Sequence, residues 1–146
     1  CFSSPMLLYG GTMTRIDHAA VWVADLEAAR DFYTTWFGGV AGELYHNPRT
    51  GLSTYILTFG TGARLELMTR PDVTAPGAGD RLGWAHISFA LADPPAVDAM
   101  ARRAREAGVQ VVDGPRRTGD GYYEVALLDP EGNRVEVVAG DYAPAS

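Results

Sequence analysis

An internal repeat limits the folds that are open to this chain. His18 leads an apolar stretch that ends at Asp25, and 68 residues later His86 leads a similar stretch that ends at Asp93. Self-similarity at a fixed spacing indicates a structural unit that is used twice. We therefore expect two copies of one supersecondary unit that share a core.

The repeat returns at the end of each copy. Glu66 lies in the segment ARLELM, and 70 residues later Glu136 lies in the segment NRVEVV. Side chains alternate across a strand, so each Glu faces away from its apolar neighbours. A single Glu in an apolar strand is more often a solvent-facing residue than a functional one. Its recurrence at an equivalent position, together with a His in each copy, favours a shared role.

The spacing of apolar residues predicts the same order of elements in both halves. Alternation predicts a strand and a period near 3.6 predicts a helix, while Asp25 and Asp93 are suited to cap helices because their carboxylates accept free backbone N–H groups. Each half therefore reads β-α-β-β-β, and the predicted fold class is α+β. The predicted strands are 16–24, 40–45, 53–59, 63–68, 84–92 and 109–113, the helices run from Asp25 to Phe37 and from Asp93 to Ala107, and a hairpin follows.

This hairpin lies near the end of the chain. Two β-rich runs flank the segment Asp129-Pro-Glu-Gly-Asn133. Proline fixes φ for a turn and glycine supplies a left-handed residue, so the segment predicts a tight connection. Glu136 then lies in the returning strand, on the face opposite to Val135 and Val137.

The segments outside the two halves predict the domain organisation. Residues 1–13 look like a loose tail or an added remnant, with a natural start expected at Met13, and residues 141–146 look like a C-terminal tail. The segment from Arg70 to Gly83 is rich in Pro, Gly, Asp and Thr and predicts a linker or loop. Residues 14–140 therefore form one expected domain, with halves at about 14–70 and 83–140.

Composition excludes several classes of function. A net charge of −6 argues against a nucleic-acid-binding surface, which needs a basic face. No apolar run approaches the roughly 20 residues that cross a bilayer, so no membrane partner is expected. The one cysteine excludes an intrachain disulfide, which fits a reducing cytoplasm.

Two His and two Glu at equivalent positions of the repeat suggest a metal site. If the halves are related by a pseudo-two-fold axis, His18, Glu66, His86 and Glu136 converge. Imidazole and carboxylate ligands suit a divalent ion such as Zn, Ni, Co, Mn or Fe, and four of them leave two positions of a six-coordinate ion for water or substrate oxygens. The alternative is that both His are satisfied core residues and both Glu face solvent.

Other polar and aromatic residues carry weaker signals. His46 lies in a predicted turn, has no counterpart in the second half, and is expected to be a solvated surface residue. Arg64 and Arg134 each precede a Glu by two residues and so share its strand face. Each is expected to snorkel at a strand end, and the alternatives are a pair with a neighbouring carboxylate or with an acidic group of a substrate. The candidate pocket aromatics are Tyr55, Phe59, Trp84, Tyr122 and Tyr123.

These features together resemble the vicinal oxygen chelate superfamily, which includes glyoxalase I, bleomycin-resistance proteins and extradiol dioxygenases. The resemblance covers roughly Thr14 to Ala139 and rests on the paired β-α-β-β-β halves, the His-led strands and the segment from Asp129 to Glu136. It implies two modules that form a curved mixed sheet around a metal cleft. Several stretches also resemble small bacterial glyoxalase-like proteins whose substrate is uncertain.

The ligand pattern within this superfamily narrows the expected activity. His18, Glu66, His86 and Glu136 fall where glyoxalase I has its metal ligands, and the resemblance implies a lyase or isomerase acting on the hemithioacetal of a 2-oxoaldehyde and a thiol. Glu136 is then the expected base that removes the C1 proton, and a carboxylate, Glu136 or Glu66, returns it at C2 through an enediolate. The chain shows no added segment of the kind that completes a glutathione pocket, so a different thiol or substrate is also open.

The resemblance leaves open other functions and whether one chain or two form the site. Another metal-assisted reaction, such as epimerisation or thiol transfer, is one alternative, and a non-catalytic protein that sequesters an antibiotic is another. Four intact ligands favour an enzyme, because a sequestering groove does not need them. Family members often build each site from two subunits, so a homodimer is expected, with the site either within one chain or across two.

Overall fold

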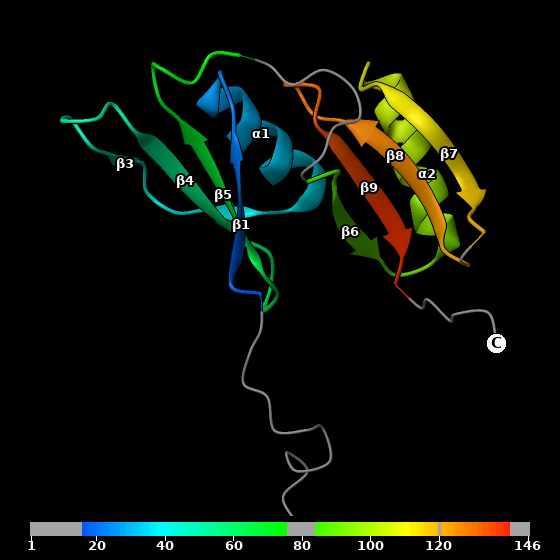
Figure 1. Cartoon of the computed structure of the whole chain (residues 1–146). Helices are drawn as coiled ribbons and strands as arrows, with labels where there is room; N and C mark the ends of the chain where they lie inside the picture. The colour runs from blue at the N-terminus through cyan, green and yellow to red at the C-terminus, as the bar shows by residue number, and fades with distance from the viewer. Residues whose placement is uncertain (1–15, 76–83, 120, 141–146) are drawn as a thin grey trace, which may run out of the picture.

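The computed structural model of the chain describes residues 16–75, 84–119 and 121–140 (Figure 1). The two predicted tails, 1–13 and 141–146, lie outside the described residues, as does the second half of the predicted loop between Arg70 and Gly83. The described residues form two helices and nine strands, which confirms the predicted α+β class.

Each half of the chain forms its own module with its own sheet. The first sheet has the order β1-β5-β4-β2, with β3 also paired to β4, and the second has the order β6-β9-β8-β7. The first module contains β1 (His18–Trp22), α1 (Leu26–Phe37), β2 (Val40–Ala41), β3 (Tyr45–His46), β4 (Ser53–Thr58) and β5 (Arg64–Thr69). The second contains β6 (Ile87–Leu91), α2 (Pro94–Glu106), β7 (Val111–Arg117), β8 (Tyr123–Leu128) and β9 (Arg134–Ala139).

The two modules repeat the same strand register as well as the same order. The first strand of each module runs parallel to its last strand: β1 pairs with β5, and β6 pairs with β9. Ala20 lies opposite Glu66 in the first pair, and Ser88 lies opposite Glu136 in the second. Each of these small residues follows its module's His by two positions, so the repeat seen in the sequence is also a repeat in three dimensions.

Both predicted helix caps form. The side chain of Asp25 accepts a hydrogen bond from the backbone N–H of Ala28 at 2.9 Å, and the side chain of Asp93 accepts one from Ala96 at 3.0 Å. These bonds satisfy N–H groups that have no partner within the helix. Gly38 ends α1 in the left-handed region at φ 69°, which a residue without Cβ adopts with little strain.

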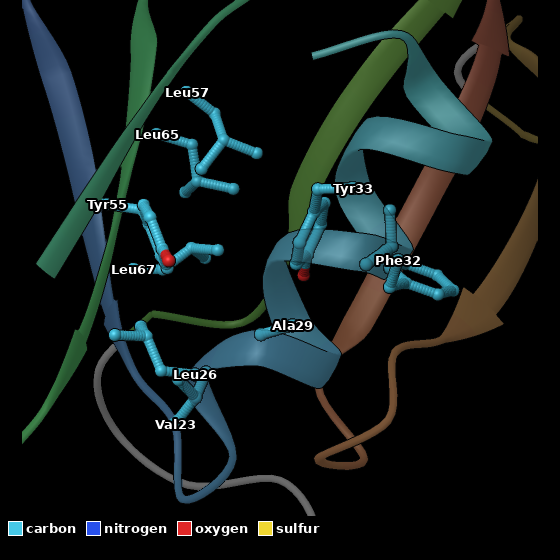
Figure 2. Close-up of a cluster of buried hydrophobic side chains, with 10 residues drawn as sticks. Val23, Leu26, Ala29, Phe32, Tyr33, Tyr55, Leu57, Leu65 and Leu67 are labelled. Atoms are coloured by element: carbon cyan, nitrogen blue, oxygen red, sulfur yellow. The ribbon is translucent and has the colours of Figure 1, made fainter. Parts of the chain in front are cut away.

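One face of each sheet packs against helices. In the first module, the core-facing residues of β4 and β5 lie under α1 (Figure 2). Leu57 and Leu67 are fully buried there, and each contributes roughly 1.5–3 kcal/mol through burial alone. In the second module, α2 covers Val125, Leu127 and Val137. The opposite face of each sheet carries Glu66 in the first module and Glu136 in the second.

The helix α1 also joins the two modules, since it lies between β5 and β6 (Figure 1). The ring of Phe37 stacks on that of Phe89 in β6, with centroids 4.1 Å apart. Glu131, in the turn after β8, accepts hydrogen bonds from the backbone N–H groups of Ala24 at 2.9 Å and Asp25 at 2.8 Å. A carboxylate is stabilised at the N-terminus of a helix, so the hairpin turn of one module caps the helix of the other.

A buried hydrogen bond adds to this contact between modules. The Tyr33 hydroxyl, on α1, donates to Asp129 Oδ2 at 2.7 Å. Asp129 also accepts from the backbone N–H groups of Glu131 at 2.9 Å and Asn133 at 2.8 Å, so the same carboxylate shapes the hairpin turn. Burial, reinforced by the charge and hydrogen bond of Asp129, raises the pKa of Tyr33 well above its ordinary value.

This raised pKa predicts a specific loss of stability in alkali. Above about pH 10 an unfolded tyrosine ionises, while buried Tyr33 keeps its proton, so the unfolded state binds fewer protons and stability falls as pH rises. Tyr33→Phe is expected to be less stable than wild type by about 2 kcal/mol at pH 7, with the difference shrinking by pH 11. Urea unfolding at pH 7, 9 and 11 measures this difference. Tyr45→Phe, at an exposed tyrosine, is the control; a Tyr33→Phe difference that stays constant with pH contradicts the prediction.

Three predicted strands differ most from the structure. The predicted strand 40–45 is interrupted: Val40 pairs with Thr58 but Tyr45 pairs with Thr54, so one extra residue is accommodated as in a bulge. The strand predicted at 84–92 starts at Ile87 rather than Trp84. The strand predicted to end at Asp113 continues to Arg117, because two register shifts accommodate the Gly-Pro pair at 114–115.

Candidate functional site

The predicted His and Glu residues project from the sheet faces that the helices do not cover. Val135 and Val137 are fully buried, and Glu136 between them has a side chain that is 13% exposed. Glu66 lies between buried Leu65 and Leu67 and is 22% exposed. The prediction that each Glu faces away from its apolar neighbours is confirmed.

The first module brings His18 and Glu66 together. His18 Nε2 lies 3.6 Å from Glu66 Oε2. On the other side of the ring, His18 Nδ1 lies 2.8 Å from Asp17 Oδ2, and Arg64 Nη2 donates to the same oxygen at 2.7 Å. A carboxylate on one ring nitrogen fixes the orientation of the imidazole and leaves the other nitrogen to act as a ligand.

The second module brings His86 and Glu136 together with different support. His86 Nε2 lies 3.2 Å from Glu136 Oε2, and Arg134 Nε donates to Glu136 Oε1 at 3.2 Å. Arg134 Nη2 is also 3.7 Å from Asp113 Oδ2. The two pairs are therefore supported differently. In the first module an aspartate bonds the His, whereas the residue before His86 is an alanine, and in the second module an arginine bonds the Glu.

A cavity of about 420 Å³ lies beside the second pair. Its polar lining consists of the imidazole of His86, two carboxylates and three hydroxyl groups. These other polar groups belong to Glu124, Glu136, Ser88, Thr118 and Tyr122. Val138 adds an apolar wall. Such a cavity has the size and the converging polar groups of a small-molecule site.

Only one of the five candidate pocket aromatics lines this cavity. Tyr122 does so. Tyr55 is buried under α1, and Phe59 packs against Phe89 with ring centroids 5.0 Å apart. The Tyr123 hydroxyl donates to Asp98 on α2, so that ring lies on the helix-covered face, and Trp84 is fully exposed.

The four predicted ligands do not converge within one chain. Across the described parts of the chain, no group of three or more His, Cys, Asp or Glu is placed so that it could hold a metal ion. Whether the site lies within one chain or across two was left open by the sequence, and the structure brings the four residues together as two separate His–Glu pairs. His46, predicted in a turn, lies in β3, is exposed, and shares a hydrogen bond with Ser53 at 2.7 Å.

Sequence reasoning missed several residues around the pairs. Asp17 is adjacent to His18, and neighbouring side chains in an extended chain point in opposite directions, so alternation gave no reason to link them. Glu124 had a usable signal, since alternation in the hairpin places it on the face of Ala126, which lies opposite Glu136. Asp113 had none, because its contact with Arg134 depends on the bulged register of β7.

The structure also bears on a membrane role. Neither helix in the described residues is long and apolar enough to span a bilayer.

Comparisons with known proteins agree with this fold. The family model of the glyoxalase/bleomycin resistance protein/dioxygenase superfamily matches residues 15–137. The uncharacterised protein PA2024 of Pseudomonas aeruginosa is 32% identical over 139 residues, which cover 86% of this chain and 88% of that protein.

Solved structures show the same architecture. Glyoxalase I of Leishmania major, described as trypanothione-dependent, superposes with a TM-score of 0.71 at 22% identity, covering 86% of each chain. Lactoylglutathione lyase of Agrobacterium tumefaciens superposes with a TM-score of 0.64 at 26% identity, covering 87% of this chain and 94% of that one. A match over most of its length, with the repeated modules, places this chain in the glyoxalase/bleomycin resistance protein/dioxygenase superfamily.

Proposed function

We propose that this protein is a metal-dependent lyase or isomerase of the glyoxalase I type, acting on a hemithioacetal or a related small oxygen-chelating substrate. The observation that carries the proposal is the equivalent His–Glu pair on each module, at the same register of the same two strands. The likeness to a lactoylglutathione lyase at 26% identity supports the choice of activity.

The donor atoms of each pair fit a divalent cation. Two ligands that are each about 2.0–2.2 Å from one ion are themselves about 3 Å apart, and the observed N–O separations are 3.6 Å for His18–Glu66 and 3.2 Å for His86–Glu136. Imidazole with carboxylate suits Zn, Ni, Co, Mn or Fe. One pair alone supplies two ligands, whereas such sites commonly use three or four protein ligands.

We propose that a second copy of the chain supplies the missing ligands. In a symmetric homodimer, His18 and Glu66 of one chain face His86 and Glu136 of the other, and symmetry creates two identical sites. Apolar side chains beside the first pair support this arrangement: Trp22 is 40% exposed, and Ile56, which lies opposite Glu66 in the sheet, is 37% exposed. Exposed apolar groups of this kind are typical of surfaces that a partner covers.

Residues of the chain itself are then proposed to carry out the proton transfer. The metal, when bound, polarises the substrate oxygens and so acidifies the adjacent C–H. Glu136 removes the proton from C1 of the hemithioacetal and the same carboxyl group returns it at C2, so no proton is gained or lost overall. Arg134 holds Glu136 by its second oxygen, and the limited exposure of Glu136 keeps water from competing for the proton. Glu66 supplies the second carboxylate of the site.

Metal analysis followed by turnover tests this proposal. Purified protein is expected to contain about one divalent ion per chain and to convert the methylglyoxal adduct of at least one small thiol. Removal of the ion with a chelator is expected to abolish turnover, and its return to restore turnover. Protein that stays metal-free under all loading conditions, yet binds a large planar drug tightly, would instead support a sequestering function.

A further inference from the structure

We propose that Asp17 is a positioning residue that makes the two halves of the metal site unlike. In the first module Asp17 bonds both His18 and the nearby arginine, Arg64. The second module has Ala85 at the equivalent position, and its arginine, Arg134, bonds the glutamate instead. The metal in this inference rests on the proposed function, whereas the orientation of the His18 ring is a property of the chain itself.

The two arginines occupy equivalent positions in the two modules. Each lies two residues before the Glu of its module. Arg64 lies opposite His18 in the parallel pair of β1 and β5. Arg134 and His86 each come one residue before the first pair of the β6 and β9 ladder. A nearby side chain, rather than the fold, is therefore the source of the difference in what the two arginines contact.

Asp17 explains the contact that Arg64 makes. Its Oδ2 lies 2.8 Å from His18 Nδ1 and accepts a hydrogen bond from Arg64 Nη2 at 2.7 Å. Both contacts use this one oxygen, so a further partner at Oδ1 leaves them intact. Among the described residues, no ion pair joins Arg64 to Glu66, the carboxylate on its own strand face. Asp17 thus holds the arginine away from Glu66 and leaves that carboxylate to act as a ligand.

The same contact sets which nitrogen of His18 carries the proton. An ionised carboxylate only accepts hydrogen bonds, so Nδ1 of the neutral ring donates to Asp17 and Nε2 keeps its lone pair. Nε2 is the nitrogen that lies toward Glu66, 3.6 Å from Oε2. The His18 side chain is 45% exposed, so packing alone restrains the ring weakly. Asp17 therefore supplies the orientation in which Nε2 can bind an ion.

The second module shows the arrangement without the aspartate. Arg134 Nε donates to Glu136 Oε1 at 3.2 Å, and Glu136 Oε2 lies 3.2 Å from His86 Nε2. A hydrogen bond from an arginine competes with an ion for the same carboxylate. The first half of the site is thus built to hold the ion, while the carboxylate of the second half is shared with an arginine, which suits the group that is proposed to move a proton.

Nitrogen NMR of the full chain before metal loading tests the orientation of the ring without turnover. Long-range proton–nitrogen spectra at about pH 8.5, where an ordinary imidazole is neutral, distinguish the two ring nitrogens. We expect the proton of His18 on Nδ1 in wild type and a shift toward Nε2 in Asp17→Ala. Asp31→Ala, which removes the carboxylate of another exposed arginine pair, is the control and is expected to change nothing. A wild-type proton on Nε2, or an unchanged tautomer in Asp17→Ala, overturns the inference.

The affinity for cobalt(II), measured by competition with a chelator, tests the consequence for metal binding. Asp17→Ala is expected to weaken binding about tenfold or more, as the loss of a partner that supports a ligand commonly does. The released Arg64 is then expected to bond Glu66, as its counterpart does in the second module. Asp17→Ala/Arg64→Gln is therefore expected to bind about two- to fivefold more tightly than Asp17→Ala. A double variant that binds no better than the single one contradicts the proposed role.

The outcomes also separate this inference from the proposed reaction. Cobalt binding that depends on Asp17, without turnover of any methylglyoxal adduct, supports the positioning role and overturns the reaction. Turnover by a protein whose cobalt affinity is unchanged in Asp17→Ala overturns the positioning role and leaves the reaction standing. A wild-type chain that binds no cobalt overturns both.

Discussion

Glu136→Gln is expected to lower kcat/KM for the methylglyoxal adduct by about a thousandfold or more. Glutamine has the shape of glutamate but does not accept a proton at catalytic pH. Its amide oxygen can still accept the hydrogen bond that Arg134 now donates to Oε1. The melting temperature is therefore expected to stay within a few degrees of wild type, and the loss is in the chemical step rather than in folding.

Metal content distinguishes the loss of a base from the loss of a ligand. Bound metal and kcat/KM are to be measured on the same preparation of Glu136→Gln, with Glu106→Gln as the charge-matched control. A variant that retains metal and loses turnover supports Glu136 as the base. A variant that loses the ion and recovers full turnover at high metal concentration shows that Glu136 serves only as a ligand.

The local elements of the fold could be predicted because short-range chemistry determines them. Asp25 and Asp93 were expected to cap helices, and each accepts the first-turn N–H that the prediction requires. The hairpin around Asp129 was expected from its Pro and Gly, and β8 and β9 flank it as predicted. In each case the residues that decide the conformation lie within a few positions of one another.

The pairing of strands that are distant in the sequence was harder to predict. The interruption between Val40 and Tyr45 arises from how β2 and β3 align with β4, and Gly42 is the one residue in 40–45 that is typical of such a break. The continuation of β7 past Asp113 depends on register shifts against β8. A sequence pattern states which residues share a face, but it does not state the register of the partner strand.

In the candidate site, too, the arrangement within one module could be predicted better than the arrangement of the two modules. The repeat identified a His and a Glu at equivalent positions of each half, and parallel pairing of the first and last strands brings the two together within each module. The relation between modules is different. It depends on α1, whose Phe37 and Tyr33 contact Phe89 and Asp129 of the second module, and such contacts leave no periodic signal in the sequence. The separation of the two pairs therefore appeared only in the structure.

Mixing two inactive variants, His18→Ala and His86→Ala, is expected to restore activity if two chains build each site. In the proposed dimer, one site of a mixed pair carries both substitutions and the other carries neither. A purified mixed dimer, obtained with two different affinity tags, is then expected to show about half of wild-type activity per dimer, and an unsorted equal mixture about a quarter. Each variant alone is expected to lose a ligand and most of its turnover.

A second mixture, in which both substitutions lie in the same module, is the matched control. His18→Ala mixed with Glu66→Ala is expected to stay inactive, because both residues belong to the same module and each site of the mixed dimer then lacks one of them. Recovery with this second mixture would contradict the proposed pairing of modules. If each chain instead assembled its own four ligands, neither mixture would regain activity, since every chain in both mixtures lacks one ligand. The contrast between the two mixtures therefore tests the assignment of each His to its own half-site and the need for a second chain to complete it.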